Sequence, residues 1–482
     1  MAEVTVSPGG GRPGPILEDA YPGFQRAVLH WAYDLLWLVA IVVGGPWWIL
    51  RSLVNADFRA VVLGALTWSL PALPGLPALP GLPALSGPGG RRRKAGSGPG
   101  NPAGQRKRIL VHGVSVGEVK AAQSLVRGLE EEAANGEALE VIISASTATG
   151  LKVARDLYPD HLVVRFPVDL SFIVRRFLGR LAPTSVILIE LEIWPNFLRE
   201  ANRLGVPVAV VNGRITVESF ARYCRFRSLL PQFGRITLFC AQDEVYADRF
   251  RTLSAAPTRV LTSGNLKVDG LRVGRRLPKP ETLKQMGPRD GQLVLVGGST
   301  HNPEELLLTQ AWRETFPEAR LVLVPRHPGR AGEIIRALSQ AGEKCQRLSE
   351  LRAAGQAADA GRPLVVDTIG ELEEVYSLAD LAFVGGSLVP HGGQNMLEPA
   401  AQGVACIYGP HVGNFSREAS LLESAGASER LSAAGELGGS CARLLGDGAG
   451  REAMGAAALV AVAGERGAAG KTLSALGAAG LC

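Results

Sequence analysis

The chain has 482 residues, of which 46% are hydrophobic and 20% charged, a globular composition with room for about two or three domains. The formal net charge of +6 fits an anionic partner, but no stretch interleaves basic and aromatic residues as single-strand nucleic-acid binders do, so nucleic acid is not an expected partner. The 6 cysteines form no CxxC pair, which argues against a disulfide framework and a cysteine metal site.

The first predicted element is a membrane-anchor helix near the N-terminus. Between Arg26 and Arg51 the only acidic or basic side chains are His30 and Asp34, and aromatic residues lie near both ends, as in the interfacial belts of membrane helices. The apolar run Leu35–Leu50 is short for a full span, which takes about 20 apolar residues. A single-pass anchor, an interfacial anchor and a helix buried in the N-terminal domain therefore all fit the segment.

Positive charge is denser after this helix than before it. Because of the run Arg91-Arg92-Arg93-Lys94 and its neighbours, the positive-inside bias places the bulk of the chain on the cytoplasmic or equivalent face of the membrane. The run fits either a contact with anionic lipid or a solvated linker. Residues 71–85 read PALPGLPALPGLPAL, a Pro/Gly repeat that cannot bury a core, so we expect a low-complexity linker.

From Arg108 onward, short β-branched runs alternate with amphipathic helical stretches, and the pattern restarts after a passage rich in Pro, Gly, Lys and Arg. Strand–helix alternation predicts parallel sheets covered on both faces. We therefore expect an α/β fold of two doubly wound, Rossmann-like domains facing a cleft. Ligands of such sheets bind outside the carboxyl ends of the strands, so functional residues should follow the strands directly.

The predicted strands are residues 109–112, 140–144, 162–165, 185–190, 206–211, 236–241 and 259–262 in the first half, and 293–297, 320–324, 364–366, 381–384 and 404–407 in the second. The predicted organisation is an N-terminal tail (1–26), a membrane-anchor helix (27–51), a low-complexity linker (71–105), an N-terminal domain (106–270), an interdomain linker (271–291) and a C-terminal domain (292–482).

The first candidate site is the stretch HGVSVGE, residues 112–118, directly after a predicted strand. Its glycines let the backbone approach a ligand closely. Glu118 would lie at the start of a helix beside the cleft, where a carboxylate can take a proton from a hydroxyl group. A first-turn glutamate also stabilises a helix through its dipole, so the spacing leaves both roles open.

A second acidic stretch, ELEIWPN, follows a fully apolar strand at residues 190–196. Glu190 and Glu192 would there meet sugar hydroxyls or a second catalytic group. They fit equally well as capping residues for the helix that can begin at Pro195.

Two segments in the second half suit an anionic ligand. Residues 297–301, GGSTH, combine backbone amides and hydroxyls with a helix start directly after a strand. Further on, Arg326 leaves a strand end between two prolines, and its planar guanidinium suits a phosphate oxygen.

The most specific local pattern lies at residues 385–399, where GGS is followed by HGGQNMLEP. Its glycines permit a tight loop around phosphate, and the helix that follows offers free amides. Glu398 can bind ribose hydroxyls, and Glu371 can face the same pocket from a neighbouring loop. HExxH, P-loop and clustered DxD-type motifs are all missing from the sequence, so we expect no catalytic metal.

Taken in order, these motifs resemble the 3-deoxy-D-manno-octulosonic acid (Kdo) transferase family. The resemblance runs from about Arg108 to Phe415, and the ordered set is far more specific than any one motif. The matching stretches are HGVSVGEV, SASTATG, FPVDL, ELEIWPN, VNGRIT, SGNLKVD, GGSTH, VPRHP, GELEEVYSLAD, FVGGSLVPHGGQNMLEPA and YGPHVGNF. Gln394 departs from the pattern, because the family more often has histidine there.

The resemblance implies a GT-B fold and an inverting, metal-independent transfer of Kdo from CMP-Kdo to a lipid A precursor of the lipid IVA type, with no further cofactor. It implies that Glu118 is the general base. The positions that match the family's CMP-binding segments are Pro325, Arg326, Ile369, Gly370, Glu371, Asn395, Met396, Leu397 and Glu398. It also implies membrane lipids as partners, in the inner membrane of a bacterium or a mitochondrial or plastid membrane of a eukaryote.

Two other functions fit parts of the pattern. One is a GT-B transferase that uses another nucleotide sugar, and the other is a non-catalytic relative that binds membrane lipid. The presence of Glu118, Arg326 and Glu398 favours an enzyme over the second alternative.

Overall fold

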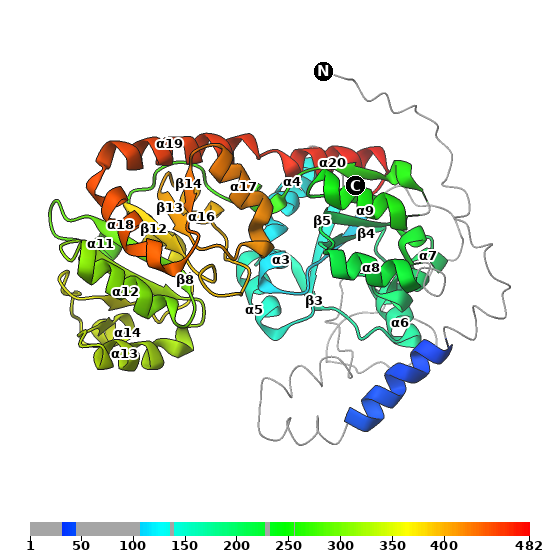
Figure 1. Cartoon of the computed structure of the whole chain (residues 1–482). Helices are drawn as coiled ribbons and strands as arrows, with labels where there is room; N and C mark the ends of the chain where they lie inside the picture. The colour runs from blue at the N-terminus through cyan, green and yellow to red at the C-terminus, as the bar shows by residue number, and fades with distance from the viewer. Residues whose placement is uncertain (1–30, 45–106, 135–138, 227–231, 255) are drawn as a thin grey trace. The chain divides into compact units, whose positions relative to one another are not determined.

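Two parallel β-sheets organise the chain, each with seven strands (Figure 1). The computed structural model describes residues 31–44, 107–134, 139–226, 232–254 and 256–482. The chain divides into two compact units, which we describe separately: unit 1 comprises residues 1–270 and 467–482, and unit 2 comprises residues 271–466. The predicted tail and low-complexity linker lie outside the described residues.

The sheet of unit 1 has the strand order β3-β2-β1-β4-β5-β6-β7 and is parallel throughout. Its strands are β1 (Lys107–His112), β2 (Leu139–Ala145), β3 (Leu162–Arg165), β4 (Ser185–Ile189), β5 (Val208–Gly213), β6 (Leu238–Ala241) and β7 (Val260–Thr262). Its α-helices are α3 (Val116–Ala121), α4 (Gln123–Ala134), α5 (Ala148–Leu157), α6 (Ser171–Leu181), α7 (Pro195–Arg203), α8 (Val217–Phe226), α9 (Glu244–Leu253), α10 (Leu266–Asp269) and α20 (Ala468–Ala478).

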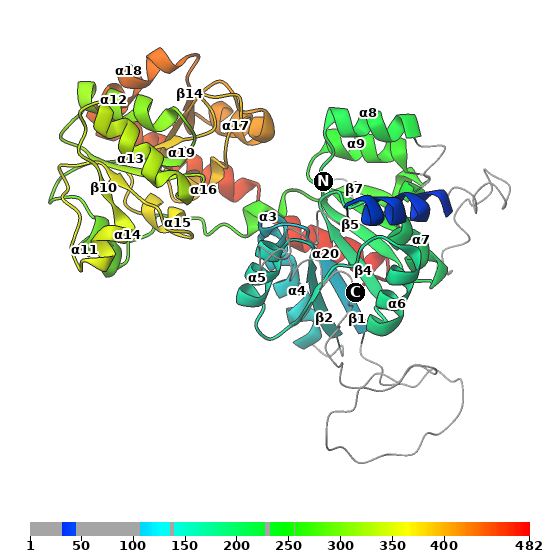
Figure 2. The ribbon, with the colours of Figure 1, turned by 90° about the horizontal axis from the view of Figure 1, so that it is seen from below.

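Helices cover both faces of this sheet, as the near-continuous apolar strands predicted. Along β1, Ile109 and Val111 join the core cluster on the α4 side, whereas Leu110 joins the cluster on the α6 side. Figure 2 shows β1 and β2 between α4 and α6. Because successive strand residues point to opposite faces, one short strand supplies two cores.

The sheet of unit 2 has the order β10-β11-β9-β8-β12-β13-β14 and is also parallel. Its strands are β8 (Val294–Thr300), β9 (Arg320–Pro325), β10 (Gln346–Arg347), β11 (Leu364–Val365), β12 (Leu381–Val384), β13 (Ala405–Tyr408) and β14 (Ser428–Arg430). Its α-helices are α11 (Pro280–Met286), α12 (Glu304–Thr315), α13 (Ala331–Gln340), α14 (Leu348–Ala353), α15 (Leu372–Tyr376), α16 (Leu397–Ala400), α17 (Ser416–Ser424), α18 (Leu437–Gly446) and α19 (Gly448–Gly464).

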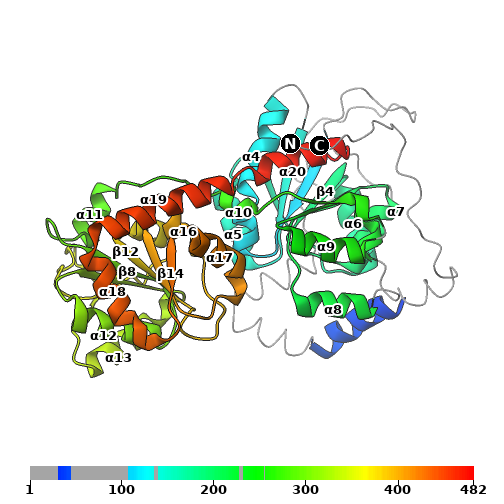
Figure 3. The same ribbon diagram turned by 45° about the horizontal axis from the view of Figure 1, so that its top comes forward.

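The C-terminal segment returns to unit 1, which differs from the predicted domain of residues 292–482. Leu476 and Leu481 are buried in the core cluster that also contains β1, and α20 lies beside α4 and α10 (Figure 3). Asp269 caps this last helix by accepting hydrogen bonds from the amides of Gly467 and Ala469. The chain therefore passes between the units twice, near residues 270 and 466.

The predicted membrane-anchor helix is described only at residues 31–44, which are helical. Among the described residues, no helix is both long and apolar enough to cross a membrane. A spanning anchor at residues 27–51 therefore gains no support from the structure.

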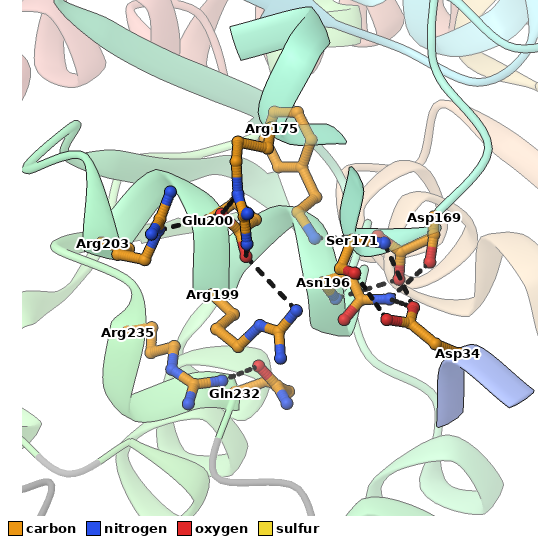
Figure 4. A network of polar contacts seen from close by, with 11 residues as sticks. Asp34, Asp169, Ser171, Arg175, Asn196, Arg199, Glu200, Arg203, Gln232 and Arg235 are labelled. Carbon is orange, nitrogen blue, oxygen red and sulfur yellow. Dashed lines mark hydrogen bonds and ion pairs between the residues drawn. The ribbon is translucent and has the colours of Figure 1, made fainter. Parts of the chain in front are cut away.

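Polar contacts hold this N-terminal helix against the starts of α6 and α7 (Figure 4). The carboxylate of Asp34 accepts hydrogen bonds from the amide (3.1 Å) and hydroxyl (2.5 Å) of Ser171 and from the side-chain amide of Asn196 (2.7 Å). Leu170, the N-cap residue of α6, has no side chain that can cap the helix. Asp34 therefore supplies the cap of α6 from a distant part of the chain.

Asp169 performs the same task for α7. Its carboxylate accepts hydrogen bonds from the amides of Asn196 (3.1 Å) and Phe197 (2.8 Å) and from the hydroxyl of Tyr33 (3.1 Å). Burial raises the pKa of Asp169 to about 6, although the two amide hydrogen bonds oppose that shift. Two acids thus join the N-terminal helix to two helices of unit 1.

Replacing Asp34 by Ala should loosen the start of α6. Loss of a helix cap costs about 1 kcal/mol, so we expect the first-turn amides of α6 to exchange about fivefold faster by hydrogen–deuterium exchange mass spectrometry. Leu36→Ala, at an exposed position of the same helix, is the control. Unchanged exchange around Ser171 in Asp34→Ala would contradict the capping role.

Candidate functional site

Charged side chains gather at the carboxyl edge of the unit 1 sheet, where the adjacent strands β1 and β4 end. Glu118 follows β1, Glu190 and Glu192 follow β4, and Lys267 lies in α10. Lys267 forms an ion pair with Glu190 at 2.6 Å, and both charges act on the pKa of Glu118. Sequence analysis singled out the three acids but missed Lys267, whose motif lies far along the chain.

Glu118 is the third residue of α3, and its carboxylate turns back toward the start of that helix. One oxygen accepts a hydrogen bond from the amide of Val114 at 2.5 Å, and the other from the hydroxyl of Ser115 at 3.0 Å. This arrangement is close to a capping box, so the structural role left open by the sequence is present. Each carboxylate oxygen keeps a second lone pair for a further donor, such as a substrate hydroxyl.

The surroundings of Glu118 favour proton uptake. Burial raises the pKa of its half-buried carboxyl, the amide of Val114 opposes the shift, and the negative charge of Glu190 adds to it. The absence of a side chain on Gly113 leaves room for Glu118, because a Cβ on residue 113 would lie 3.0 Å from the Cβ of Glu118.

His112 in the same motif is fully buried and stacked on Phe166, and burial lowers its pKa to about 3, so it is a neutral core residue.

Glu192 is the most strongly perturbed acid of the group. Burial, followed by the charge of Glu118, raises its pKa to about 7, while a hydrogen bond of 2.8 Å from the indole nitrogen of Trp194 opposes the shift. Glu192 is therefore a second group at this edge that changes protonation near neutral pH. Pro195 is the first residue of α7, as predicted.

In unit 2 the predicted nucleotide-binding residues follow β9, β11 and β12. The strands β11, β9, β8 and β12 are consecutive in the sheet, so the loops after them share one edge. Pro325 ends β9 and is buried, while the adjacent Arg326 is exposed. Residues 369–371 lie between β11 and α15, and residues 395–398 lie at the start of α16.

The segment Ile369–Glu371 has an exposed apolar tip and a paired acid. The side chain of Ile369 is 90% exposed, and Gly370 has a φ of 90°, a left-handed conformation that favours glycine. Glu371 accepts a hydrogen bond of 2.6 Å from Arg352 and another from Thr368, and these contacts, with that of Arg352 the larger, lower its pKa.

Only part of the segment Asn395–Glu398 can face a ligand through side chains. Met396 and Leu397 are buried in the core, so their contribution would come from the backbone. Asn395 accepts a hydrogen bond from the amide of Leu397 at 3.2 Å and donates one to Glu398 at 3.1 Å. Because α16 is a single turn, its dipole is a weak source of positive charge, and Arg326 becomes the stronger candidate for phosphate binding.

The glycines of GGSTH serve packing rather than anion binding. Gly297 and Gly298 lie within β8, and a Cβ on Gly298 would come 2.0 Å from the hydroxyl oxygen of Tyr376. A Cβ on Gly297 would come 2.6 Å from the side chain of Leu308. The anion site predicted for residues 297–301 therefore gains no support from these two glycines and stays a prediction.

A carboxylate of the protein itself occupies the glycine loop after β12. Glu304, which is fully buried, accepts hydrogen bonds from four backbone amides at distances of 2.7 to 2.9 Å. The donors are the amides of His301, Gly386, Ser387 and Leu388. The glycine pattern predicted a loop around phosphate, but these four amides already bind Glu304 and are not available to a phosphate. Sequence analysis missed Glu304.

Comparison with known proteins gives a consistent result. A family model described as "3-Deoxy-D-manno-octulosonic-acid transferase (kdotransferase)" matches residues 90–270. The chain is 34% identical over 401 residues to the 3-deoxy-D-manno-octulosonic acid transferase of Bordetella pertussis, covering 78% of the chain and 88% of that protein. It is 32% identical over 313 residues to the transferase of the same name from Haemophilus influenzae, covering 64% and 71%.

Solved structures show a similar fold. A glycosyltransferase from Rickettsia africae ESF-5 has a TM-score of 0.54 and 13% identity, covering 77% of this chain and 98% of its own. At that identity the likeness concerns the fold alone. The two parallel-sheet α/β units are thus like those of GT-B glycosyltransferases, as predicted.

Replacing Glu304 by Ala should destabilise unit 2, because four buried amides lose their acceptor. We expect a loss of about 3 kcal/mol in the free energy of unfolding, measured by urea denaturation. Glu314→Ala, at an exposed position of the same helix, should change it by less than about 0.5 kcal/mol. Equal stability of the two variants would show that Glu304 does not organise the loop.

Replacing Glu192 by Gln should flatten the pH dependence of stability. Because the folded-state pKa lies above the ordinary 4.5, at about 7, the folded protein binds this proton more tightly than the unfolded chain. Wild-type stability should therefore fall as the pH rises from about 5 to 7, and the variant should be the more stable at pH 8, on the order of 2 kcal/mol. Urea denaturation at several pH values tests this, with exposed Glu131→Gln as control; a parallel decline in both variants would contradict it.

Proposed function

Because the chain belongs to the Kdo transferase family, we propose that it transfers Kdo from CMP-Kdo to a lipid A precursor of the lipid IVA type. The reaction proposed is inverting and independent of metal. The observation that carries the proposal is the carboxylate of Glu118, half-buried at the carboxyl edge of the unit 1 sheet, with a raised pKa and lone pairs left for a hydroxyl donor.

In the proposed reaction Glu118 acts as the general base. An acceptor hydroxyl gives its proton to the carboxylate while its oxygen forms a bond to the anomeric carbon of Kdo. The bond from that carbon to the phosphate oxygen breaks, and CMP leaves with the electron pair. A single displacement of this kind inverts the anomeric centre.

The departing phosphate needs positive charge, which Arg326 supplies in this proposal. Its guanidinium is exposed beyond β9, and a planar fork of donors matches phosphate oxygens without a metal ion. The carboxylates of Glu371, at the start of α15, and Glu398, in the first turn of α16, are acceptors suited to the hydroxyls of the nucleotide's ribose.

We also propose that the N-terminal helix holds unit 1 at a lipid surface, on the cytoplasmic or equivalent face of the membrane. Its exposed apolar side chains are Trp31, Leu35, Leu36, Leu38, Val39, Val42 and Val43. Nearby, Arg175, Arg199 and Arg203 share the single buried carboxylate of Glu200, which leaves positive charge for anionic lipid (Figure 4). Such a surface would bring the enzyme to a lipid acceptor in the membrane.

Replacing Glu118 by Gln should abolish Kdo transfer while CMP still binds. Glutamine keeps a carbonyl oxygen for the amide of Val114 but cannot take a proton, so we expect turnover to fall at least about 100-fold. Mass spectrometry of a tetraacylated lipid A precursor incubated with CMP-Kdo measures the product, and calorimetry measures the affinity for CMP.

Exposed Glu131→Gln serves as the control for that experiment and should keep wild-type turnover. Near-normal turnover in Glu118→Gln would rule out the base assignment. A wild-type protein that binds UDP in preference to CMP would instead overturn the choice of donor.

A further inference from the structure

Three histidines meet at the carboxyl edge of the unit 2 sheet, beside the residues proposed to bind CMP. His301 follows β8, His327 follows β9, and His391 lies in the loop after β12, three strands that are neighbours in the sheet. The ring centroids of His301 and His391 are 4.5 Å apart, and those of His301 and His327 are 5.9 Å apart. We call these three residues the histidine cluster. The mechanism above does not use it.

The carboxylates nearest the histidine cluster are already paired with other groups. Besides the other two histidines, the charged groups that act on His301 are Arg330 and Glu305, which are paired with each other at 2.9 Å. The carboxylate of Glu304 already accepts hydrogen bonds from four backbone amides, one of which is the amide of His301. An incoming anion would therefore meet imidazoles rather than a competing acid.

The cluster is also accessible and adjacent to the proposed nucleotide site. His327 and His391 are exposed, and His301 is half-buried. His327 directly follows Arg326 in the chain, and the side chain of Gln394, which directly precedes Asn395, lies 3.3 Å from the Nε2 atom of His301. Among the described residues, no group of three or more His, Cys, Asp or Glu side chains is arranged to hold a metal ion.

We propose that His301, His327 and His391 bind the carboxylate of the donor sugar. This inference rests on the proposed function. Kdo is a 2-ulosonic acid, so in CMP-Kdo the carbon that carries the phosphate also carries a carboxylate. Two anions on one carbon repel each other and require two separate groups of donors. Arg326 serves the phosphate, and the adjacent imidazoles serve the carboxylate.

Histidine makes this recognition depend on pH. Burial, then the nearby His391 and His327, lowers the pKa of His301 in the free protein, and a bound carboxylate opposes that shift. Donor binding would thus draw a proton onto His301, and the KM for CMP-Kdo should rise with increasing pH. The other charged groups that face the cluster are Arg330, Glu305 and Glu304.

The test compares His391→Ala with wild-type enzyme in Kdo transfer at fixed acceptor concentration. We expect the KM for CMP-Kdo to rise about 10- to 100-fold, because a hydrogen bond to a charged group is lost. The inhibition constant of CMP, which has no sugar carboxylate, should change less than about twofold. His391→Lys, which keeps a cationic donor, should keep the low KM, and His161→Ala in unit 1 is the control.

The outcomes test the carboxylate subsite and the proposed function separately. An unchanged KM in His391→Ala, or equal losses of CMP-Kdo and CMP affinity, would overturn the carboxylate subsite while leaving the proposed function standing. A wild-type enzyme that transfers no Kdo would instead refute the proposed function. Intact inhibition by CMP in His391→Ala shows that the variant is folded, so a raised KM cannot be ascribed to misfolding.

Discussion

Backbone amides that emerge from a parallel sheet at its carboxyl edge have no strand to pair with, and this chain supplies carboxylates to them. Asp34 and Asp169 accept hydrogen bonds from the first amides of α6 and α7. Glu118 accepts one from the amide of Val114, and Glu304 accepts four from amides around the loop after β12. An unpaired buried amide costs as much as a lost hydrogen bond. The conformation of the loops after β1, β3, β4 and β12 therefore depends on these acids.

This constraint explains why acids near the sheet edges have such different roles. Glu304 accepts hydrogen bonds from four backbone amides, so the amides bound to it are not available to phosphate. Glu118 makes only one hydrogen bond per oxygen, so the bonds that hold it in place leave it able to accept another. A carboxylate positioned by the fold needs little reorganisation when the hydroxyl arrives, which is an advantage for a general base.

The two units present different kinds of charged and titratable groups at their sheet edges. Unit 1 presents acids whose pKa values are raised by burial and by one another, with Lys267 as the compensating charge. Unit 2 presents Arg326 and three histidines along the edge where its glycine loop is already filled. In the proposed reaction, proton removal from the acceptor and binding of the anionic donor would thus use separate sets of side chains.

Much of the fold could be predicted from local pattern. The predicted strands match twelve observed ones within a few residues, because buried parallel strands are continuous β-branched and apolar runs. The two missed strands, β10 and β14, have two and three residues and no such run. The order of motifs likewise sufficed to identify the family and to single out Glu118 and Arg326, since each belongs to a motif that begins at the end of a strand.

Only the tertiary structure decided how those residues are supported. The cap from Asp34, the pairing of Lys267 with Glu190, the filling of the glycine loop by Glu304 and the return of α20 to unit 1 all join segments far apart in sequence. No local periodicity encodes such contacts, because each depends on which loops the sheet order makes neighbours. The sequence by itself determined the elements and the family, and the packing determined which of its polar residues are left for a ligand.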